Sequence, residues 1–207
     1  MSPLVKKSSA VMVGVCTLWI AYYGSYLPLR KSQAYIATLR AVSSVRSFKE
    51  LTDFLSYPLD LTSPIGHEEL VRNTGSLILG LVENAQDPQV AAEAVDFLES
   101  YYEPITARGR GMSFSQNLYI LGNANLKSAG VTKQLRYFEA AKHYYEEGVK
   151  LSPDRPQFLY GLFDIYRIEG NKEEVKKIGD RILSNWPTDE RVKKAMDDFL
   201  GSGDISS

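Results

Sequence analysis

The segment LSPDRPQFLYGLFDIYRIEGNKEEVKKIGDRILSNWP, residues 151–187, decides how this chain folds. Pro153 ends the phrase VKLSP and Pro187 ends the phrase LSNWP, so two similar corners lie 34 residues apart. Apolar residues recur between these corners at intervals of three and four, which is typical of helices that bury one face. The apolar positions are Phe158, Leu159, Leu162, Ile165, Tyr166, Val175, Ile178, Ile182 and Leu183. The spacing of the corners indicates a repeat.

This segment predicts a pair of helices, one over 156–168 and one over 172–185. Gly170 and Asn171 lie between them, and glycine readily adopts the left-handed backbone conformation that ends a helix. Two short helices cannot bury their apolar faces alone, so the hairpin needs neighbouring hairpins to pack against. No segment of the chain shows a convincing strand pattern, and the expected fold class is all-α.

The segments on both sides supply further helices. LYILGNANLKSAG at 118–130 and YFEAAKHYYEEGVKLSP at 137–153 predict a preceding hairpin. About seven extra residues around GVTKQLR are expected to lengthen its surface loop, at little cost in free energy. TDERVKKAMDDFLG at 188–201 predicts a closing helix with Thr188 or Asp189 as its N-cap.

The two hairpins resemble the tetratricopeptide repeat family, whose unit is about 34 residues long. The regular unit, counted from Pro156, matches the family's positions with Leu159, Leu162, Phe163, Tyr166, Val175, Gly179, Ile182 and Pro187. The stretched unit before it offers Leu118, Leu121, Gly122, Ala141, Tyr145, Gly148 and Pro153. Phe163, Val175 and Ile182 are larger than the family prefers, so neighbouring residues must make room for them. The resemblance implies an α-solenoid of antiparallel helix hairpins.

The same resemblance implies a binding function, because stacked repeats of this family form a concave groove for proteins or peptides. On the family's pattern, the groove-facing positions are Gln116, Tyr119, Asn123, Leu126, Gln157, Tyr160, Asp164 and Arg167. The candidate partner-binding residues among them are Tyr119, Asn123, Gln157, Tyr160, Asp164 and Arg167. The amide of Asn123 can bind a peptide backbone because it both donates and accepts hydrogen bonds. The alternative is that these side chains only form solvated polar faces.

Residues 9–29, SAVMVGVCTLWIAYYGSYLPL, predict a membrane anchor. The run carries no charge, and about 20 apolar residues span a bilayer as a helix. Aromatic residues that suit the headgroup layer gather towards one end: Trp19, Tyr22, Tyr23 and Tyr26. A buried soluble helix and a cleaved signal peptide are the alternatives. Cys16 is the one cysteine of the chain, so no intrachain disulfide can form, and we expect it to pack or to face lipid.

The charges that flank this run nearly balance. Lys6 and Lys7 favour a cytoplasmic N-terminus. The basic residues beyond the run favour the opposite orientation: Arg30, Lys31, Arg40 and Arg46. A short Lys-Lys tail resembles an uncleaved signal anchor, so we expect a single-pass membrane protein whose soluble part is extracytoplasmic.

Paired helices are also expected between the anchor and the repeats. The helix boundaries are predicted by a stop at Tyr57–Pro58, a cap at Ser63, a cap at Asp87 before Pro88, and a stop at Pro104. The expected organisation is an anchor over 1–29, paired helices over 30–104, repeats with a closing helix over 105–200, and a frayed tail over 201–207.

We find no residue pattern that predicts catalysis. His67 begins a His-Glu-Glu phrase, but Val71 occupies the position where a zinc-binding helix needs its second histidine, and His143 is distant in sequence. The formal net charge of −1 argues against nucleic acid as the main partner. We expect a noncatalytic protein without a metal or a small-molecule cofactor.

A second resemblance covers more of the chain. The order of an apolar span, a long helix, the phrase SPIGHEELV at 63–71, paired helices and the two repeat phrases is similar to the C-terminal part of bacterial O-antigen ligase/polymerase-family membrane proteins that carry tetratricopeptide repeats. The family's catalytic loops have no counterpart in these residues, so no catalytic residue carries over. The resemblance implies an alternative function, an accessory domain of surface-polysaccharide machinery.

Overall fold

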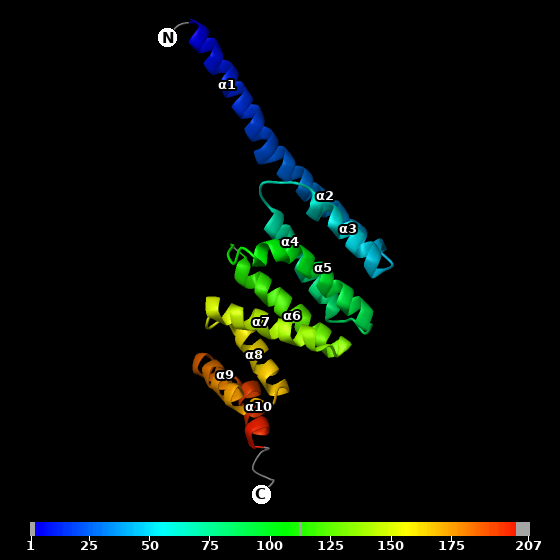
Figure 1. Cartoon of the computed structure of the whole chain (residues 1–207), viewed down its shortest axis with the longest axis vertical. Coiled ribbons are helices and arrows are strands. Elements are labelled where there is room, and N and C mark those ends of the chain that lie inside the picture. The colour runs from blue at the N-terminus through cyan, green and yellow to red at the C-terminus, as the bar shows by residue number, and fades with distance from the viewer. Residues whose placement is uncertain (1–2, 112, 202–207) are drawn as a thin grey trace. The chain divides into compact units, whose positions relative to one another are not determined.

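Helices make up the regular structure of this protein (Figure 1). The computed structural model describes residues 3–111 and 113–201, and no strand occurs among them. The all-α prediction is therefore confirmed. The chain divides into two compact units, residues 1–74 and 75–207, and each is described by itself.

The first unit begins with a long, continuous helical run. Its elements are α1 (Pro3–Ala21), the π-helical turn η1 (Tyr22–Tyr26), α2 (Leu27–Ala41) and the 3₁₀ turn η2 (Val42–Ser44). The N–H of Leu27 donates to the carbonyl of Tyr22, five residues back, which makes this turn wider than an α-helical one. Pro28 follows directly and has no N–H to donate, and the wide turn before it keeps the helix unbroken. The anchor predicted over 9–29 thus continues into α2 without a loop.

Helix α3 (Phe48–Asp60) begins with reciprocal capping. The hydroxyl of Ser47 accepts a hydrogen bond from the N–H of Glu50 at 3.2 Å. The carboxylate of Glu50 in turn accepts one from the N–H of Arg46 at 2.9 Å. The first bond satisfies a backbone donor that the first turn of a helix leaves free, and the second bond ties the residue before the N-cap to that turn.

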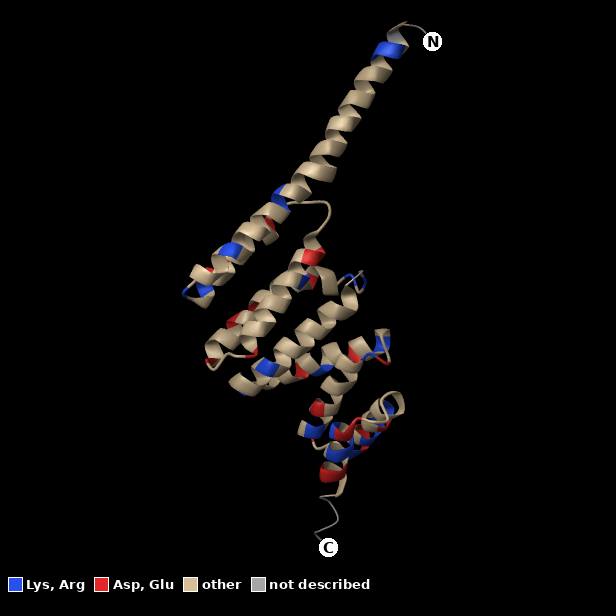
Figure 2. Cartoon of the chain, turned by 180° about the vertical axis from the view of Figure 1, so that it is seen from behind, with Lys and Arg blue, Asp and Glu red and all other residues tan. Residues whose placement is uncertain are grey.

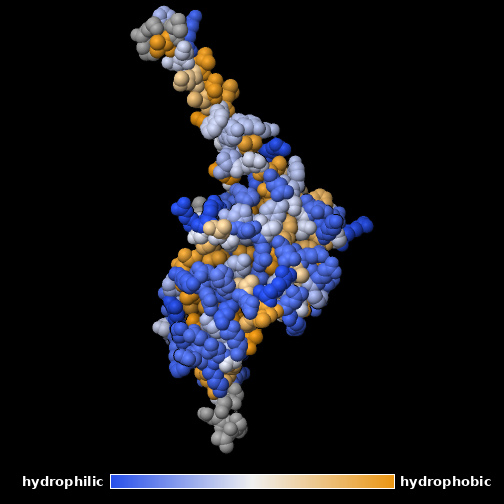
Figure 3. All heavy atoms as spheres, viewed as in Figure 1, coloured by the Kyte–Doolittle hydropathy of each residue, from blue (hydrophilic) through white to orange (hydrophobic). Residues whose placement is uncertain are grey.

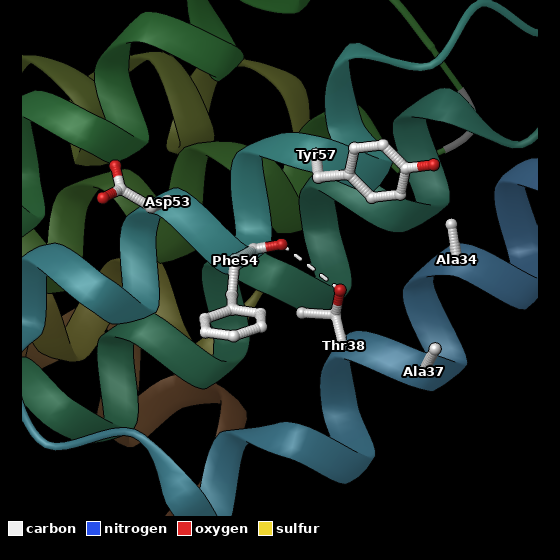
Figure 4. Close-up of a pocket in the computed structure, with 6 residues that line it drawn as sticks. All are labelled: Ala34, Ala37, Thr38, Asp53, Phe54 and Tyr57. Atoms are coloured by element: carbon white, nitrogen blue, oxygen red, sulfur yellow. Dashed lines mark hydrogen bonds between the residues drawn. The ribbon is translucent and has the colours of Figure 1, made fainter.

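The stop expected at Tyr57–Pro58 is wrong, because α3 continues to Asp60 with Pro58 inside it. A proline in a helix leaves the carbonyl four residues earlier without its usual donor, and here that carbonyl belongs to Phe54. The hydroxyl of Thr38, on α2, donates to the Phe54 carbonyl at 3.2 Å (Figure 4). Contact with α2 therefore lets the helix pass through its proline.

The C-terminal end of α3 is also held by α2. The ammonium group of Lys31 donates to the carbonyls of Leu59 and Leu61, at 2.9 and 2.8 Å. It lies 3.0 Å from Nδ1 of His67 as well. A cation suits the last turn of a helix, where carbonyl groups lack intrahelical partners.

We expect Thr38→Val to lower the free energy of unfolding by about 1–2 kcal/mol, because the Phe54 carbonyl loses its donor. Pro58→Ala should restore most of this loss, since alanine at position 58 supplies an N–H to the same carbonyl. Thr52→Val is the control, because the Thr52 hydroxyl bonds only to Lys49 within one helix. Denaturant unfolding of the full chain in detergent measures each value. Equal losses for Thr38→Val with and without Pro58→Ala would contradict this assignment.

The second unit is a series of helices in which each packs against the next from α5 onward. The elements are α4 (His67–Val82), which crosses the division between the units, α5 (Pro88–Thr106), α6 (Phe114–Thr132), α7 (Leu135–Leu151), α8 (Pro156–Ile168), α9 (Lys172–Asn185) and α10 (Glu190–Gly201). Helices α5 and α6 are antiparallel, because Ser128 donates to the carbonyl of Ala91 while Asn125 donates to the carboxylate of Glu99.

The hairpin predicted from residues 151–187 is confirmed at both helices: α8 covers 156–168 and α9 covers 172–185. Gly170 has φ +73°, in the left-handed region expected of it. The side chain of Asn171 accepts a hydrogen bond from the N–H of Glu174 at 3.1 Å and caps α9.

The other expected caps have mixed outcomes. Asp87 accepts from the N–H of Gln89 at 2.8 Å and caps α5, as predicted. Asp189 likewise accepts from the N–H of Val192 at 3.0 Å at the start of α10. The cap expected at Ser63 is wrong, because α4 begins only at His67.

Two further expectations about boundaries are wrong. Helix α5 does not stop at Pro104 but continues to Thr106. The extra residues around GVTKQLR do not form a long loop, because only Lys133 and Gln134 separate α6 from α7. Lys133 has φ +58°, and this single left-handed residue ends α6. The additional length lies within the helices.

Glycines provide the close contacts between these helices. A Cβ atom at Gly122 of α6 would lie 2.9 Å from the ring of Tyr145, and one at Gly161 of α8 would lie 2.6 Å from it. Gly179 of α9 faces Met196 of α10 in the same way. These glycines make room for the facing side chains, and the larger Phe163, Val175 and Ile182 are all buried.

Candidate partner-binding surface

The predicted groove residues lie on two helices that share one aromatic ring. Tyr119 and Asn123 lie on α6, and the other four lie on α8. Tyr145 of α7 inserts its ring between Gly122 of α6 and Gly161 of α8. The C-terminal ends of α6 and α8 line the same pocket, so the two helices run in the same direction. We call the surface they present the α6/α8 face.

Two of the predicted residues, Tyr119 and Asp164, lie near Tyr145, and a third, Asn123, bonds to Tyr119. Burial raises the pKa of Tyr145, and the proximity of Tyr119 and Asp164 raises it further. The amide of Asn123 donates to the Tyr119 hydroxyl at 3.3 Å and to the carboxylate of Glu83 at 3.5 Å. The centre of the face is therefore a small polar group that rests on a buried aromatic floor.

Arg167 extends this group along α8. Its guanidinium donates to the carboxylate of Asp164 at 3.3 Å and lies 5.6 Å from the ring centre of Phe163. The side chain of Asp164 remains 58% exposed, and that of Arg167 remains 39% exposed. An exposed ion pair of this kind contributes little to stability, so both groups can exchange it for a partner at small cost.

The remaining two predicted residues make contacts inside the chain. Gln157 accepts from Arg155 at 3.3 Å, and Arg155 also donates to Ser115 at 2.6 Å and to Gln116. Arg155 thereby bridges the N-terminal ends of α6 and α8.

Tyr160 is held against the turn between α9 and α10. Its hydroxyl donates to the carboxylate of Asp189, and this bond lowers the pKa of Asp189. Its ring stacks on Trp186 with the ring centres 6.2 Å apart, and the Arg191 guanidinium lies 5.0 Å from the ring centre. The contacts of Tyr160 are therefore with Trp186, Asp189 and Arg191 and not with the polar group around Tyr145.

An apolar pocket of about 490 Å³ opens at the C-terminal ends of α6 and α8. It is lined by Leu126, Ala129, Gly130, Lys133, Gln134, Leu135, Phe138, Ile168 and Glu169. Leu135 is 66% exposed and Ile168 is 67% exposed, which is unusual for large aliphatic side chains next to one another. Of these residues only Leu126 was among the predicted groove positions. Leu135 was placed in the expected loop, and Ile168 was the last residue of an expected helix, so neither indicated a pocket.

The first unit holds a separate apolar pocket of about 480 Å³ between α2 and α3. Its lining residues are Ala34, Ala37, Thr38, Asp53, Phe54 and Tyr57 (Figure 4). Phe54 and Tyr57 are exposed, at 41% and 59%. The pocket offers the hydroxyl groups of Thr38 and Tyr57 and the carboxylate of Asp53 among apolar walls.

The N-terminal helical run is long and apolar enough to cross a membrane. It covers Val5–Ser44, and only 6% of its most apolar window is buried in the structure. Figure 2 shows no charged ribbon along most of α1, and Figure 3 shows apolar side chains along its surface. Trp19, Tyr22, Tyr23 and Tyr26 form a chain of ring contacts at the end of α1 and in η1. Cys16 is exposed within this helix.

In the described residues, 3–111 and 113–201, no group of three or more His, Cys, Asp or Glu side chains could hold a metal ion. Comparison with protein-family models, with curated protein sequences and with solved structures gives no match.

Proposed function

We propose that this protein is a membrane-anchored, noncatalytic scaffold of stacked, tetratricopeptide-like helix hairpins. It binds a protein or peptide partner through the α6/α8 face, and residues 9–29 hold it in the membrane with the second unit on the extracytoplasmic side. The arrangement around Tyr145 is the observation that supports this proposal most directly. It places two parallel helices on one ring and leaves amide, carboxylate and guanidinium groups along a single face.

These groups suit the recognition of a polypeptide. Asn123 offers both a donor and an acceptor to a backbone, while Asp164 and Arg167 can each pair with a charged side chain. A large aromatic ring beneath them keeps the backbones of α6 and α8 at a fixed separation. Preorganised groups of this kind bind at a lower entropic cost than flexible ones.

Asp164→Lys should weaken partner binding strongly, and Asp180→Lys on α9 is its matched control. The two aspartates are 58% and 56% exposed, and each forms one surface ion pair within its own helix. We expect Asp164→Lys to reduce recovery of the partner from detergent-solubilised native membranes at least tenfold, as measured by quantitative mass spectrometry. Asp180→Lys should leave recovery unchanged. Equal recovery with both variants, at unchanged helical content, would overturn the proposal.

A further inference from the structure

The apolar pocket at the ends of α6 and α8 continues the proposed binding face. Leu126 follows Asn123 by one turn on α6, and Ile168 follows Asp164 by one turn on α8. Both line the pocket, together with Leu135 and Phe138 at the start of α7. A partner that lies along the polar group around Tyr145 therefore reaches an apolar depression at the C-terminal end of the same face.

The free charge at this pocket is positive. Glu169 is the one acidic residue in its lining, and the ammonium group of Lys142 already neutralises it at 2.7 Å. Lys133 also lines the pocket, and its ammonium group has no hydrogen bond or ion pair within the described chain. An apolar floor beside an unpaired cation favours a ligand that carries both aliphatic side chains and carboxylates.

The first turn of α7 brings a partial positive charge to the pocket, which offsets part of the partial negative charge that the C-terminal ends of α6 and α8 bring to it. Gln134 occupies the N-cap position but makes no side-chain hydrogen bond to the turn, and the turn contains no acidic residue. The N-terminal end of a helix carries a partial positive charge that acidic groups normally balance. Here Gln134 and Leu135 present that end of α7 to the pocket.

The secondary structure of the ligand follows from the walls of the pocket. The described residues contain no strand, so no sheet edge is available to pair with an extended peptide. Proline-rich ligands require aromatic-lined grooves, whereas Phe138 is the single aromatic residue in this lining. A helix that inserts aliphatic residues from successive turns is the mode of peptide recognition that suits an apolar pocket of this kind.

We infer that the partner carries an acidic amphipathic helix whose aliphatic side enters the pocket formed by Leu126, Leu135, Phe138 and Ile168. Its carboxylates lie against Lys133 and the N-terminal end of α7. This inference rests on the function proposed above and specifies the class of partner.

Two synthetic helical peptides test it. Both carry leucine at every third and fourth position, and their remaining faces carry either glutamate or lysine. The full chain, in nanodiscs of zwitterionic lipid, holds benzoylphenylalanine in place of Ile168, and cross-linking is measured against peptide concentration. The matched control places the same probe at Leu151, which is 50% exposed at the other end of α7. We expect saturable cross-linking at position 168 only, with the acidic peptide half-saturating at a concentration at least ten times lower than the basic one.

Lys133→Glu supplies a second measurement and should remove or reverse the preference for the acidic peptide. Equal half-saturation by the two peptides, labelling at position 151 as strong as at position 168, or cross-links between two copies of the chain would each overturn the inference. These results would leave the proposed function intact if Asp164→Lys still prevented recovery of the partner. A separate result, equal recovery of the partner with Asp164→Lys and Asp180→Lys, would overturn the proposed function itself.

Discussion

Phe158→Ala should lower the free energy of unfolding by about 3–5 kcal/mol, the largest stability effect expected of a single substitution in this chain. Phe158 is fully buried, and its ring lies directly against Gly148 of α7. Removing the ring leaves a cavity between α7 and α8 that rigid helices cannot close completely.

Gly148→Ala tests the same contact from the other side. Alone, it should destabilise the protein by about 1–3 kcal/mol, because the new methyl group overlaps the Phe158 ring. In the Phe158→Ala background that methyl group enters the cavity, so the double variant should lose much less than the sum of the two single losses.

Gly130→Ala is the matched control for this cycle. Gly130 is an exposed helical glycine with no neighbouring atom within 4 Å of an added Cβ. Alanine there should be neutral or should stabilise the protein by up to about 1 kcal/mol through its higher helix propensity. Urea titration of the full chain in detergent, followed by circular dichroism and tryptophan fluorescence, measures all four values. Additive losses at positions 148 and 158 would contradict the contact.

The second large effect concerns the membrane. Val15→Arg combined with Leu18→Arg should release the chain from membranes, because each arginine in the middle of a spanning helix costs about 2.5–3.5 kcal/mol. Val15 and Leu18 are 61% and 73% exposed in the structure, so the two substitutions disturb little packing inside the protein. The combined cost of about 5–7 kcal/mol is large enough to abolish stable insertion.

Ile36→Arg with Leu39→Arg is the matched control, since these exposed residues lie on α2 beyond the uncharged run. Carbonate extraction of membranes should find the Val15/Leu18 variant in the supernatant and the control in the pellet. Retention of both variants in the pellet would show that residues 9–29 are not the anchor. An intact mass that lacks the first 29 or so residues would instead identify a cleaved signal peptide.

The helix boundaries that sequence predicted correctly are those controlled by local chemistry. Gly170 ends α8 through its left-handed conformation, and Asn171 caps the helix that follows. Both effects depend on residues next to one another in the chain, so the pattern of residues 151–187 was sufficient to predict where these two helices end and begin.

One of the incorrect boundaries depends on a contact distant in sequence. Pro58 does not end α3, because Thr38, twenty residues earlier, supplies a donor to the carbonyl that the proline leaves free. Such compensation cannot be read from the residues around Pro58. The extra length before α7 lies within helix, and α6 ends at Lys133 in the left-handed conformation, for which lysine gives little indication.

The surface residues also divide into those whose positions the sequence predicts and those whose contacts only the structure shows. The repeat pattern predicts Tyr119, Asn123 and Asp164 on one face; in the structure Tyr119 and Asp164 lie near Tyr145, and Asn123 bonds to Tyr119. The repeat pattern does not indicate that Asp189 would accept a hydrogen bond from Tyr160. The apolar pocket could not be predicted from the sequence either, because its walls come from the ends of three helices.

The unbroken backbone from α1 through η1 into α2 has a mechanical consequence. A helix resists torsion about its axis, because successive turns are joined by hydrogen bonds. Lys31 and Thr38 then fasten α2 to α3 through side-chain bonds to its backbone. A rotation of the apolar run about its own axis therefore turns the α2–α3 pair with it. The N-terminal helix is therefore coupled in rotation to the α2–α3 pair, whereas a flexible linker would leave the two free to rotate independently.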